Sequence, residues 1–407
     1  MPIMIKKVCV VGLGYIGLPT AGLLASKGFD VVGVDINEKI ISTINKGSIH
    51  IIEKDLEEVI CKAVNDKKLV AQSQPCEADI YMIAVPTPFR KTESKIPQPD
   101  LSFVLKAIRS VAPYLKKNNL LIIESTCPIG STQKILESIK KISKLDESDI
   151  NIAYCPERVL PGNILYELQN NDRVIGGIST KSSNHAKSFY SQFCSGELII
   201  TDSKTAEMVK LSENSFRDVN IAFANELSML CDTVDVDVHE LVAIANRHPR
   251  VNILVPGCGV GGHCIAVDPW FLASQDEDIT KIIQTARIVN NTKKDWVVKK
   301  IKKNVFELEK KLNRPISIGC LGLSYKPNID DLRESPALDI VMDLIKANIK
   351  TLVCEPNLKS HPNMDLYKIE DIILKADLIA ILVPHKEFYN LKLPKNNTLD
   401  FCKALCS

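Results

Sequence analysis

The stretch VVGLGYIGLPTAGLLASKGFDVVGVD, residues 10–35, decides the fold of the amino-terminal part of the chain. An apolar run leads into Gly12, Gly14 and Gly17, which have G-x-G-x-x-G spacing, and a helical pattern follows. In such a unit the first glycine allows a tight turn, the second lets a pyrophosphate approach the backbone, and the third permits close packing of helix on strand. The first amides of the helix then face the phosphates. The stretch therefore predicts a dinucleotide-binding site.

The acidic residue Asp35 closes the second strand of this unit. A carboxylate at that point can bind the ribose hydroxyls, and Ile36 and Asn37 supply no arginine for an extra phosphate, so we expect NAD rather than NADP. Two later loops leave predicted strands at their carboxyl ends, where ligands of open α/β sheets bind, and the alternative role of their threonines is that of cap or turn hydroxyls. The cofactor residues expected from these loops and from the glycine turn are Tyr15, Ile16, Thr87 and Thr126.

Composition excludes several classes of protein. A chain of 407 residues suits two or three domains, each with its own core. With 51 Lys and Arg against 49 Asp and Glu, the net charge of +2 gives no bulk attraction to nucleic acid or to an anionic membrane. The 13 scattered cysteines are typical of a reduced, cytoplasmic protein, and neither Cys402 with Cys406 nor Cys264 has partners at metal-ligand spacing. Residues 8–26 are uncharged, but their glycines break a membrane-spanning helix.

Runs such as LLIIEST, NIAYCPE and RVIGG are apolar throughout and alternate with helical stretches as far as about Thr201. This pattern is typical of strands that helices cover on both faces. From about Ser203 a helical pattern runs for roughly thirty residues without Pro or Gly, and it could pair with a copy of itself. We expect an α/β protein with two Rossmann-like, doubly wound parallel-sheet domains joined by a long-helix central segment. The expected domains are residues 1–202, 203–312 and 313–407.

On the long helical pattern, Lys210, Asn214 and Arg217 follow i, i+4, i+7 spacing and so share one helix face. Such a polar stripe is usually a solvated surface. A lysine and an asparagine can also donate hydrogen bonds to one developing oxyanion, and an arginine can bind phosphate or carboxylate. Spacing alone leaves both interpretations open.

The stretch GVGGHCIAVDPWF, residues 259–271, places Cys264 after two glycines that let backbone or ligand come close. A free cysteine is by default a small buried hydrophobe, yet it can also be a nucleophile. The adjacent His263 is a poor base for it, because neighbouring side chains diverge, and its role stays open. From the residues alone, nucleophile and core filler are both tenable.

Seven blocks in order make the whole chain resemble the UDP-sugar 6-dehydrogenases, the UDP-glucose and UDP-N-acetylhexosamine dehydrogenase family. The blocks are GLGYIGLPTA, ESTCPIGST, YCPERVLPG, KLSENSFRDVNIAFANELS, ANRHPRVN, GVGGHCIAVDPWF and LGLSYKPNIDDLRESPA. YCPERVLPG, ANRHPRVN and GGHCIAVDPWF are most similar to the branch that acts on UDP-N-acetyl-D-mannosamine. Such enzymes oxidise the C6 alcohol of the sugar to the acid with two NAD, in the service of surface polysaccharide or glycan synthesis. UDP-N-acetylglucosamine and UDP-glucose remain alternative substrates.

The resemblance implies roles for single residues. Cys264 is implied as the nucleophile that forms a thiohemiacetal and then a thioester, with Lys210 as acid/base and oxyanion partner and Asn214 as second donor. Asp268 and Glu157 are implied in proton handling and in hydrolysis, without a division of labour between them. The residues implied to hold the substrate, besides Lys210 and Asn214, are Arg158, Val159, Arg217, His248, Arg250, Gly262 and Lys326, with Arg333 on the cofactor side. The resemblance also implies a homodimer with part of the arginine set contributed across the interface.

Two rivals stand beside this hypothesis. A UDP-sugar epimerase also binds NAD, but it returns the hydride and leaves Cys264 unexplained. A sensor built on an inactive fold would be expected to have lost the lysine or the cysteine, and both are present. Net NADH formation separates the dehydrogenase from either rival.

Overall fold

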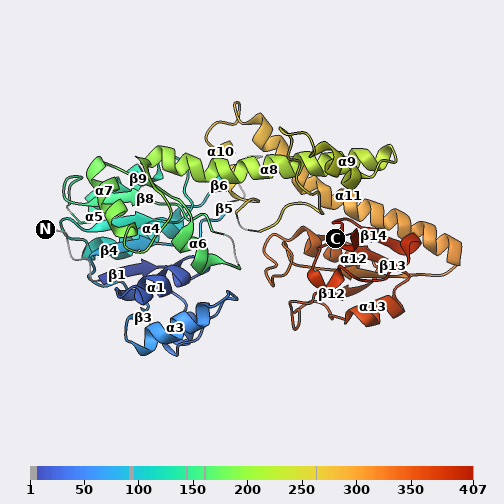
Figure 1. Cartoon of the computed structure of the whole chain (residues 1–407), viewed down its shortest axis with the longest axis horizontal. Coiled ribbons are helices and arrows are strands. Elements are labelled where there is room, and N and C mark those ends of the chain that lie inside the picture. Colours follow the sequence, from blue (N-terminus) through green and yellow to red (C-terminus); the bar gives the residue numbers. More distant parts are fainter. Residues whose placement is uncertain (1–6, 91–95, 144, 160–161, 263, 407) are drawn as a thin grey trace. The chain divides into compact units, whose positions relative to one another are not determined.

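The computed structural model describes residues 7–90, 96–143, 145–159, 162–262 and 264–406 (Figure 1). Contacts divide the chain into two compact units, Met1–Ser212 and Glu213–Ser407. Each unit has its own sheet and its own apolar core. The three-domain division at residues 202 and 312 stays a prediction.

The first unit is built on an eight-stranded sheet with the order β10-β9-β8-β7-β4-β1-β2-β3 among the described residues. The pairs from β3 across to β8 are all parallel, which confirms the expected parallel sheet and gives the strand order of a dinucleotide-binding fold. Its strands are β1 (Lys7–Val11), β2 (Asp30–Val34), β3 (Leu69–Gln72), β4 (Ile80–Ile83), β7 (Leu120–Ile123), β8 (Asn151–Tyr154), β9 (Arg173–Gly177) and β10 (Leu198–Asp202), and β5 (Phe89–Arg90) and β6 (Gln98–Pro99) form a separate hairpin.

Helices cover both faces of this sheet, because alternate strand residues point to opposite sides and both sets are apolar. One face packs on α1 (Gly17–Ser26), α2 (Glu38–Asn45), α3 (Leu56–Asn65), α6 (Ile164–Asn170) and α7 (Thr180–Tyr190). The other packs on α4 (Ser102–Val111) and α5 (Ser131–Ser143). The segment predicted to form strand, glycine turn and helix does so in β1 and α1.

One pairing departs from the expected pattern. Strand β9 runs antiparallel to β8, with Ala153 opposite Gly177 and Tyr154 opposite Gly176. The amino end of β9 therefore lies at the edge where the parallel strands have their carboxyl ends. That edge is the one at which open α/β sheets bind their ligands.

The second unit holds a smaller parallel sheet with the order β12-β11-β13-β14. Its strands are β11 (Ser317–Leu321), β12 (Lys350–Cys354), β13 (Leu378–Ile381) and β14 (Thr398–Asp400). One face packs on α11 (Lys281–Leu312) and α12 (Pro336–Lys346), and the other on α13 (Ile369–Lys375). The unit also contains α9 (Val238–Ala245) and α10 (Asp268–Ala273). The expected second Rossmann-like sheet is confirmed.

Two long helices match the two helical runs expected from the sequence. Helix α8 (Ser203–Thr233) begins in the first unit and continues into the second. Helix α11 ends at Leu312, and the capping residue Asn313 adopts the left-handed conformation at φ 51° just before Arg314 and Pro315. Neither these nor any other helix of the described residues is long and apolar enough to cross a membrane.

Candidate active site

The glycine loop after β1 has the geometry that its sequence predicts. Gly12 lies at φ 94°, donates its N–H to the Val34 carbonyl at 2.8 Å, and leaves no room for a side chain, because a Cβ would stand 2.6 Å from the Ala84 oxygen. At Gly17 a Cβ would collide with the Gly12 carbonyl, so α1 packs directly on the turn. At Gly14 a Cβ would meet nothing within 4 Å. The loop is closed around the first and third glycines and open at the second, as a bound pyrophosphate requires.

Asp35 follows β2 and lies at the rim of this loop. Its carboxylate accepts the N–H of Leu13 at 3.0 Å and of Asn37 at 2.9 Å, and the side chain is only partly buried. It retains acceptor capacity for a ribose hydroxyl. Tyr15 and Ile16 complete the turn that leads into α1.

The two threonine loops leave the neighbouring strands β4 and β7. Thr87 is buried and Thr126 is half-buried. Ser125 joins the two loops, since its hydroxyl donates to the carbonyls of Ile83 and Val85, the latter at 2.8 Å. Thr87 thus follows the carboxyl end of β4, which pairs with β1, and Thr126 follows the carboxyl end of β7, the next strand in the sheet.

Lys210 and Glu157 contact each other in the first unit. The Lys210 ammonium donates to the Glu157 carbonyl oxygen at 2.6 Å and is half-buried. This places the predicted acid/base group against the backbone of a predicted hydrolytic group. The spacing of the sequence could not show the contact, because the two residues belong to α8 and to the loop after β8.

A buried group of charges lies behind Glu157. The Arg173 cluster, as we name it, consists of Glu124, Glu157, Arg173 and Tyr190, all at most 7% exposed. An Arg173 nitrogen lies 2.9 Å from a Glu157 oxygen and another lies 3.6 Å from Glu124, and the guanidinium stacks 4.4 Å from the Tyr190 ring centre. Burial, offset in part by Arg173 and increased by Glu157, raises the pKa of Glu124 to about 7.

Sequence reasoning missed Glu124 and Arg173, although each carries a signal. Glu124 ends the apolar run LLIIE, and Arg173 begins the apolar run RVIGG, so each is a charge at the end of a buried strand. A charge in that position is costly unless it is paired. What the sequence does not show is that β9 runs antiparallel, which brings Arg173 to the edge where Glu157 lies.

Arg158 and Val159 each contact a neighbouring segment of the first unit. The Arg158 guanidinium donates to the carbonyl of Asp172, and Val159 packs against the core. Beyond it, the buried Glu53 accepts the N–H of Gly162 at 2.8 Å and of Ile164 at 2.9 Å. Glu53 was not predicted, since it lies far away in the sequence.

In the second unit the structure brings together Asn214 and Asp268. The Asn214 amide donates to the buried Asp268 carboxylate at 2.6 Å. Cys264 is exposed, and its carbonyl accepts the N–H of Asp268 at 2.8 Å in the turn that starts α10. His263, whose role the sequence leaves open, lies outside the described residues.

A buried ion pair holds the Cys264 turn. Arg287 of α11 binds Asp218 of α8 at 2.7 Å, Asn290 donates to the same carboxylate at 2.8 Å, and a second Arg287 contact reaches the Ile265 carbonyl at 3.5 Å. Burial raises the pKa of Asp218, although Arg287 partly opposes the effect. Neither residue was predicted. Arg217, next to Asp218, is exposed.

Gly262 is in direct contact with the loop that carries Lys326. It has φ 81°, a Cβ would stand 2.7 Å from the Tyr325 ring, and its N–H donates to the Arg333 carbonyl at 3.0 Å. The close backbone approach expected at this glycine is confirmed. Lys326 is half-buried, and the Arg333 side chain binds Asp331 at 2.6 Å.

The buried side chain of His385 binds the loop that carries Lys326. His385 is fully buried, and its Nδ1 accepts the N–H of Asn328 at 3.0 Å, so Nε2 carries the proton and donates to Glu355 at 3.0 Å. Burial alone would raise the pKa of Glu355, but His385 and the amide of Leu323 lower it to about 2. Neither His385 nor Glu355 was predicted.

His248 and Arg250 lie in the turn after α9, and both are exposed. The Arg250 N–H donates to Nδ1 of His248 at 3.3 Å. This turn is a surface element of the second unit. The structure alone assigns these side chains no ligand.

A glycine loop at the carboxyl edge of a doubly wound sheet, with a threonine-bearing loop on each of two adjacent strands, is typical of an NAD-dependent dehydrogenase. The chain belongs to the UDP-glucose/GDP-mannose dehydrogenase family. The NAD binding domain of that family matches residues 6–194, its central domain residues 204–292 and its UDP binding domain residues 319–403. The chain is therefore an NAD-dependent dehydrogenase that acts on a UDP-sugar, which confirms the expected enzyme class and cofactor.

Three known proteins are similar to this chain over nearly the whole length of both chains. The chain is 51% identical to UDP-N-acetyl-D-mannosamine dehydrogenase of Campylobacter jejuni, over 98% of this chain and 99% of that protein. It is 48% identical to NDP-N-acetyl-D-galactosaminuronic acid dehydrogenase of Ralstonia nicotianae, over 95% and 92%. The solved UDP-D-ManNAc dehydrogenase of Pyrococcus horikoshii matches with a TM-score of 0.90 at 37% identity, over 98% of this chain and 96% of that one.

Proposed function

We propose that this enzyme oxidises the C6 alcohol of UDP-N-acetyl-α-D-mannosamine to the uronic acid, with two NAD consumed per sugar. Relatives named for this substrate, at 51% identity in Campylobacter jejuni and 48% in Yersinia pestis, support the choice of sugar. The Ralstonia relative supports a galactosamine derivative as the nearest alternative. UDP-N-acetylglucosamine and UDP-glucose are further alternatives.

In the first oxidation Lys210 takes the proton of the C6 hydroxyl as C6 becomes an aldehyde. NAD would supply the hydride acceptor for both oxidations, and the residues proposed to hold it are the Gly12 loop, Asp35, Thr87, Thr126 and Arg333. Cys264, as thiolate, then adds to the aldehyde carbon and forms a C–S bond. Lys210 and Asn214, one turn apart on α8, donate to the resulting oxyanion. This oxyanion is the species from which a second hydride can leave.

Hydrolysis of the thioester completes the reaction. Water adds to the acyl carbon and one of its protons passes to Glu157. The C–S bond then breaks and releases the Cys264 thiolate, and the acid formed loses its second proton to solvent as the carboxylate product. The Asn214–Asp268 hydrogen bond is the observation that carries this proposal, because it holds the Asn214 amide in a fixed orientation. Asp268 in turn donates its N–H to the carbonyl of Cys264, in the turn that carries the proposed nucleophile. Asp268 is thereby the orienting group and Glu157 the hydrolytic base.

Substrate recognition follows the same assignment. The UDP binding domain that matches residues 319–403 contains Lys326, which lies in a loop packed on Gly262. Both suit the binding of a diphosphate, since a lysine supplies positive charge and a glycine lets a ligand come close to the backbone. The other residues proposed to hold the UDP-sugar are Arg158, Val159, Arg217, His248 and Arg250. We propose residues 1–202 for NAD, 203–312 for catalysis and 313–407 for UDP.

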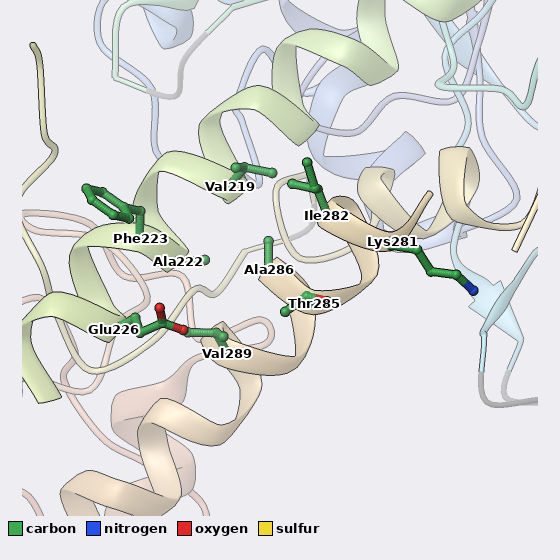
Figure 2. Close-up of a pocket in the computed structure, with 9 residues that line it drawn as sticks. All are labelled: Val219, Ala222, Phe223, Glu226, Lys281, Ile282, Thr285, Ala286 and Val289. Carbon is green, nitrogen blue, oxygen red and sulfur yellow. The ribbon is translucent and has the colours of Figure 1, made fainter. Parts of the chain in front are cut away.

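We further propose a homodimer. Phe216, Phe223 and Leu230 lie seven residues apart on α8, share one face, and are all more than half exposed. Between α8 and α11 lies an apolar pocket lined by Val219, Phe223 and Ile282 among others; Val219 points toward Ile282, and the Phe223 ring points away from α11 (Figure 2). A stripe of exposed apolar side chains beside an apolar pocket is typical of a protein interface. Replacing Phe223 by glutamate should give a monomer in analytical ultracentrifugation, with exposed Lys310→Glu as the control.

Arginines shared across the dimer can be tested by mixing variants. If the partner supplies Arg250, then inactive Cys264→Ser and inactive Arg250→Ala proteins should regain up to about a quarter of the parent activity when mixed, since mixed dimers hold one intact site. No recovery after subunit exchange would place Arg250 in its own subunit's site. The enzyme is proposed to work in the cytoplasm, in a route to surface polysaccharide.

The substrate assignment is tested with a panel of UDP-sugars, with NADH formation and product mass as readouts. UDP-N-acetyl-D-mannosamine should give the highest kcat/KM and a product heavier by one oxygen and lighter by two hydrogens. An epimerase would instead give an isomer of unchanged mass and no net NADH. A higher kcat/KM for another sugar would overturn the choice of substrate and leave the reaction class intact.

A further inference from the structure

The Arg173 cluster contains two carboxylates that compete for one guanidinium. Glu157 is held at 2.9 Å from Arg173 and also accepts the N–H of Arg158 at 2.7 Å. Glu124 lies farther from Arg173, at 3.6 Å, and accepts the Tyr190 hydroxyl at 3.1 Å. Because every member is buried, a second negative charge in the cluster is costly. The longer distance to Arg173 leaves Glu124 the less compensated of the two carboxylates.

The sheet explains why the three charges meet. Glu124 follows β7 and Glu157 lies three residues after β8, and these strands are parallel neighbours. Continued three residues beyond Tyr154, the antiparallel register of β8 and β9 places Glu157 opposite Arg173. If β9 ran parallel to β8, its first residue, Arg173, would lie at the opposite edge of the sheet. The reversal of β9 is what supplies a cation to this edge.

An ion pair of this kind has a chemical disadvantage for Glu157. A guanidinium beside a carboxylate stabilises its charged form and so makes it a weaker base toward water. The disadvantage lessens when Glu124 is also ionised, because its charge offsets that of Arg173. The charge state of Glu124 therefore bears on how readily Glu157 takes a proton.

We propose that Glu124 is a positioning residue that acts through Arg173: Arg173 holds the Glu157 carboxylate in place, and ionised Glu124 offsets the Arg173 charge so that Glu157 becomes an effective base. The inference rests on the proposed role of Glu157 in thioester hydrolysis. In that step a water O–H bond breaks, its proton goes to Glu157, and the C–S bond to Cys264 breaks as the acyl C–O bond forms. Glu124 neither touches the substrate nor exchanges a proton with it.

The groups that face Glu124 are known from each neighbouring element. They are Arg173 from β9, Glu157 and Cys155 from the segment after β8, and Tyr190 from α7. Burial, and to a smaller extent Glu157, raise the pKa of Glu124, whereas Arg173 and the Tyr190 hydrogen bond lower it. Hydrolysis should accordingly speed up as Glu124 loses its proton, around neutral pH.

The test measures hydrolysis directly. Enzyme, NAD and UDP-N-acetyl-D-mannosamine are mixed in a single turnover and quenched with acid, and the decay of the sugar adduct on Cys264 is followed by intact-protein mass spectrometry. In the parent, decay should be about tenfold faster at about pH 8.5 than at about pH 6. Glu124→Gln mimics the protonated carboxyl permanently, so it should match the parent at the lower pH and fail to accelerate at the higher one.

Two further variants sharpen the result. Tyr190→Phe removes the hydrogen bond that favours ionised Glu124, so it should move the acceleration to higher pH without abolishing it. Glu137→Gln makes the same chemical change on the exposed surface of α5 and should leave the profile unchanged. A Glu124→Gln profile that follows the parent, or that is slower by one factor at both pH values, would overturn the inference. Absence of any Cys264 adduct in the parent would instead overturn the proposed function on which it rests.

Discussion

The loop after β1 in the first unit and the loop after β11 in the second begin with the same construction. Gly12 has φ 94° and Gly322 has φ 95°, and each donates its N–H at 2.8 Å to the carbonyl that ends the neighbouring strand, Val34 or Cys354. A Cβ on Gly12 would stand 2.6 Å from the oxygen of Ala84, which follows β4, and a Cβ on Gly322 would stand 2.5 Å from Val383, two residues after β13. An acidic residue follows that neighbouring strand in both units, Asp35 in the first and Glu355 in the second.

The loops diverge at the next step. In the first, Gly14 leaves open space and α1 starts at Gly17, so helix amides and a gap are available to a pyrophosphate. In the second, Ser324 occupies the position that corresponds to Gly14, and its hydroxyl donates to the Lys326 carbonyl at 2.7 Å. No helix begins there until Pro336. The position that is open at Gly14 in the first loop therefore carries a side chain, that of Ser324, in the second loop.

The two carboxylates show the same divergence. Asp35 is partly exposed and keeps acceptor capacity for a ligand. Glu355 is buried and binds the amides of Leu323 and Ser324 as well as His385, so all its capacity serves the loop. The comparison teaches that one strand–glycine–strand frame can either bind a dinucleotide or hold a loop rigid, according to which side chains fill it.

The largest effect on stability is expected when the first glycine of either loop, Gly12 or Gly322, is replaced by alanine. Gly12→Ala and Gly322→Ala should each destabilise their unit by about 3 kcal/mol, because of left-handed strain and a clash with backbone or core. Denaturant unfolding measures this. Gly322→Ala should keep NAD affinity in the fraction that remains folded, whereas Gly12→Ala should lose it. Equal loss of NAD binding in both variants would contradict the claim that only the first loop binds the dinucleotide.

The next effect concerns acid stability. The pKa of Glu355, 4.5 unperturbed, is about 2 in the folded state, so the carboxylate contributes stability that is present above about pH 4.5 and lost as pH falls toward 2. The contribution is at most about 3 kcal/mol. Glu355→Gln should remove this part of the acid transition when unfolding is followed by circular dichroism, and UDP affinity should fall with the loosened loop. An unchanged acid transition in the variant would contradict the assigned role.

Much of this could be predicted from the sequence, and particular residues show where prediction ends. Gly12, Gly14, Gly17 and Asp35 act within one short stretch, so local spacing sufficed for the first sheet and its cofactor. Glu355 also follows a strand, yet nothing in its neighbourhood in sequence shows that it binds His385. Contacts such as that one depend on tertiary packing, which spacing does not encode.

The same limit applies within the candidate site. Lys210 and Asn214 share a face of α8 by helical periodicity, and this much was predictable. The partners of both, the Glu157 carbonyl and Asp268, were not, because they come from other segments. Arg173 was hidden for a different reason, since its place at the ligand edge follows from the reversed direction of β9.

A smaller effect, on NAD binding, is expected when the partly exposed carboxylate of Asp35 is replaced. Asp35→Asn should weaken NAD binding by about 1.5–3 kcal/mol, the range for hydrogen bonds to a charged group, while the melting temperature changes little. Isothermal titration of NAD and a thermal melt provide both readouts. A loss of stability as large as that of Glu355→Gln would show that Asp35 holds its loop in the same way.

The smallest effect should come from Gly14→Ala. Because a Cβ there meets no protein atom, the fold should keep its stability within about 0.5 kcal/mol, and only the KM for NAD should rise. The matched change Ser324→Ala should leave the KM for NAD unchanged. If Gly14→Ala lowers stability and leaves the KM for NAD as it was, the gap is not a ligand site.

The central claim, that Cys264 carries the sugar through a four-electron oxidation, is tested by counting NADH per UDP-N-acetyl-D-mannosamine in the parent and in Cys264→Ser. We expect two NADH and one uronic acid per sugar from the parent. The variant should bind NAD as the parent does and form no acid. Acid formation by Cys264→Ser at near the parent rate would contradict the thioester route.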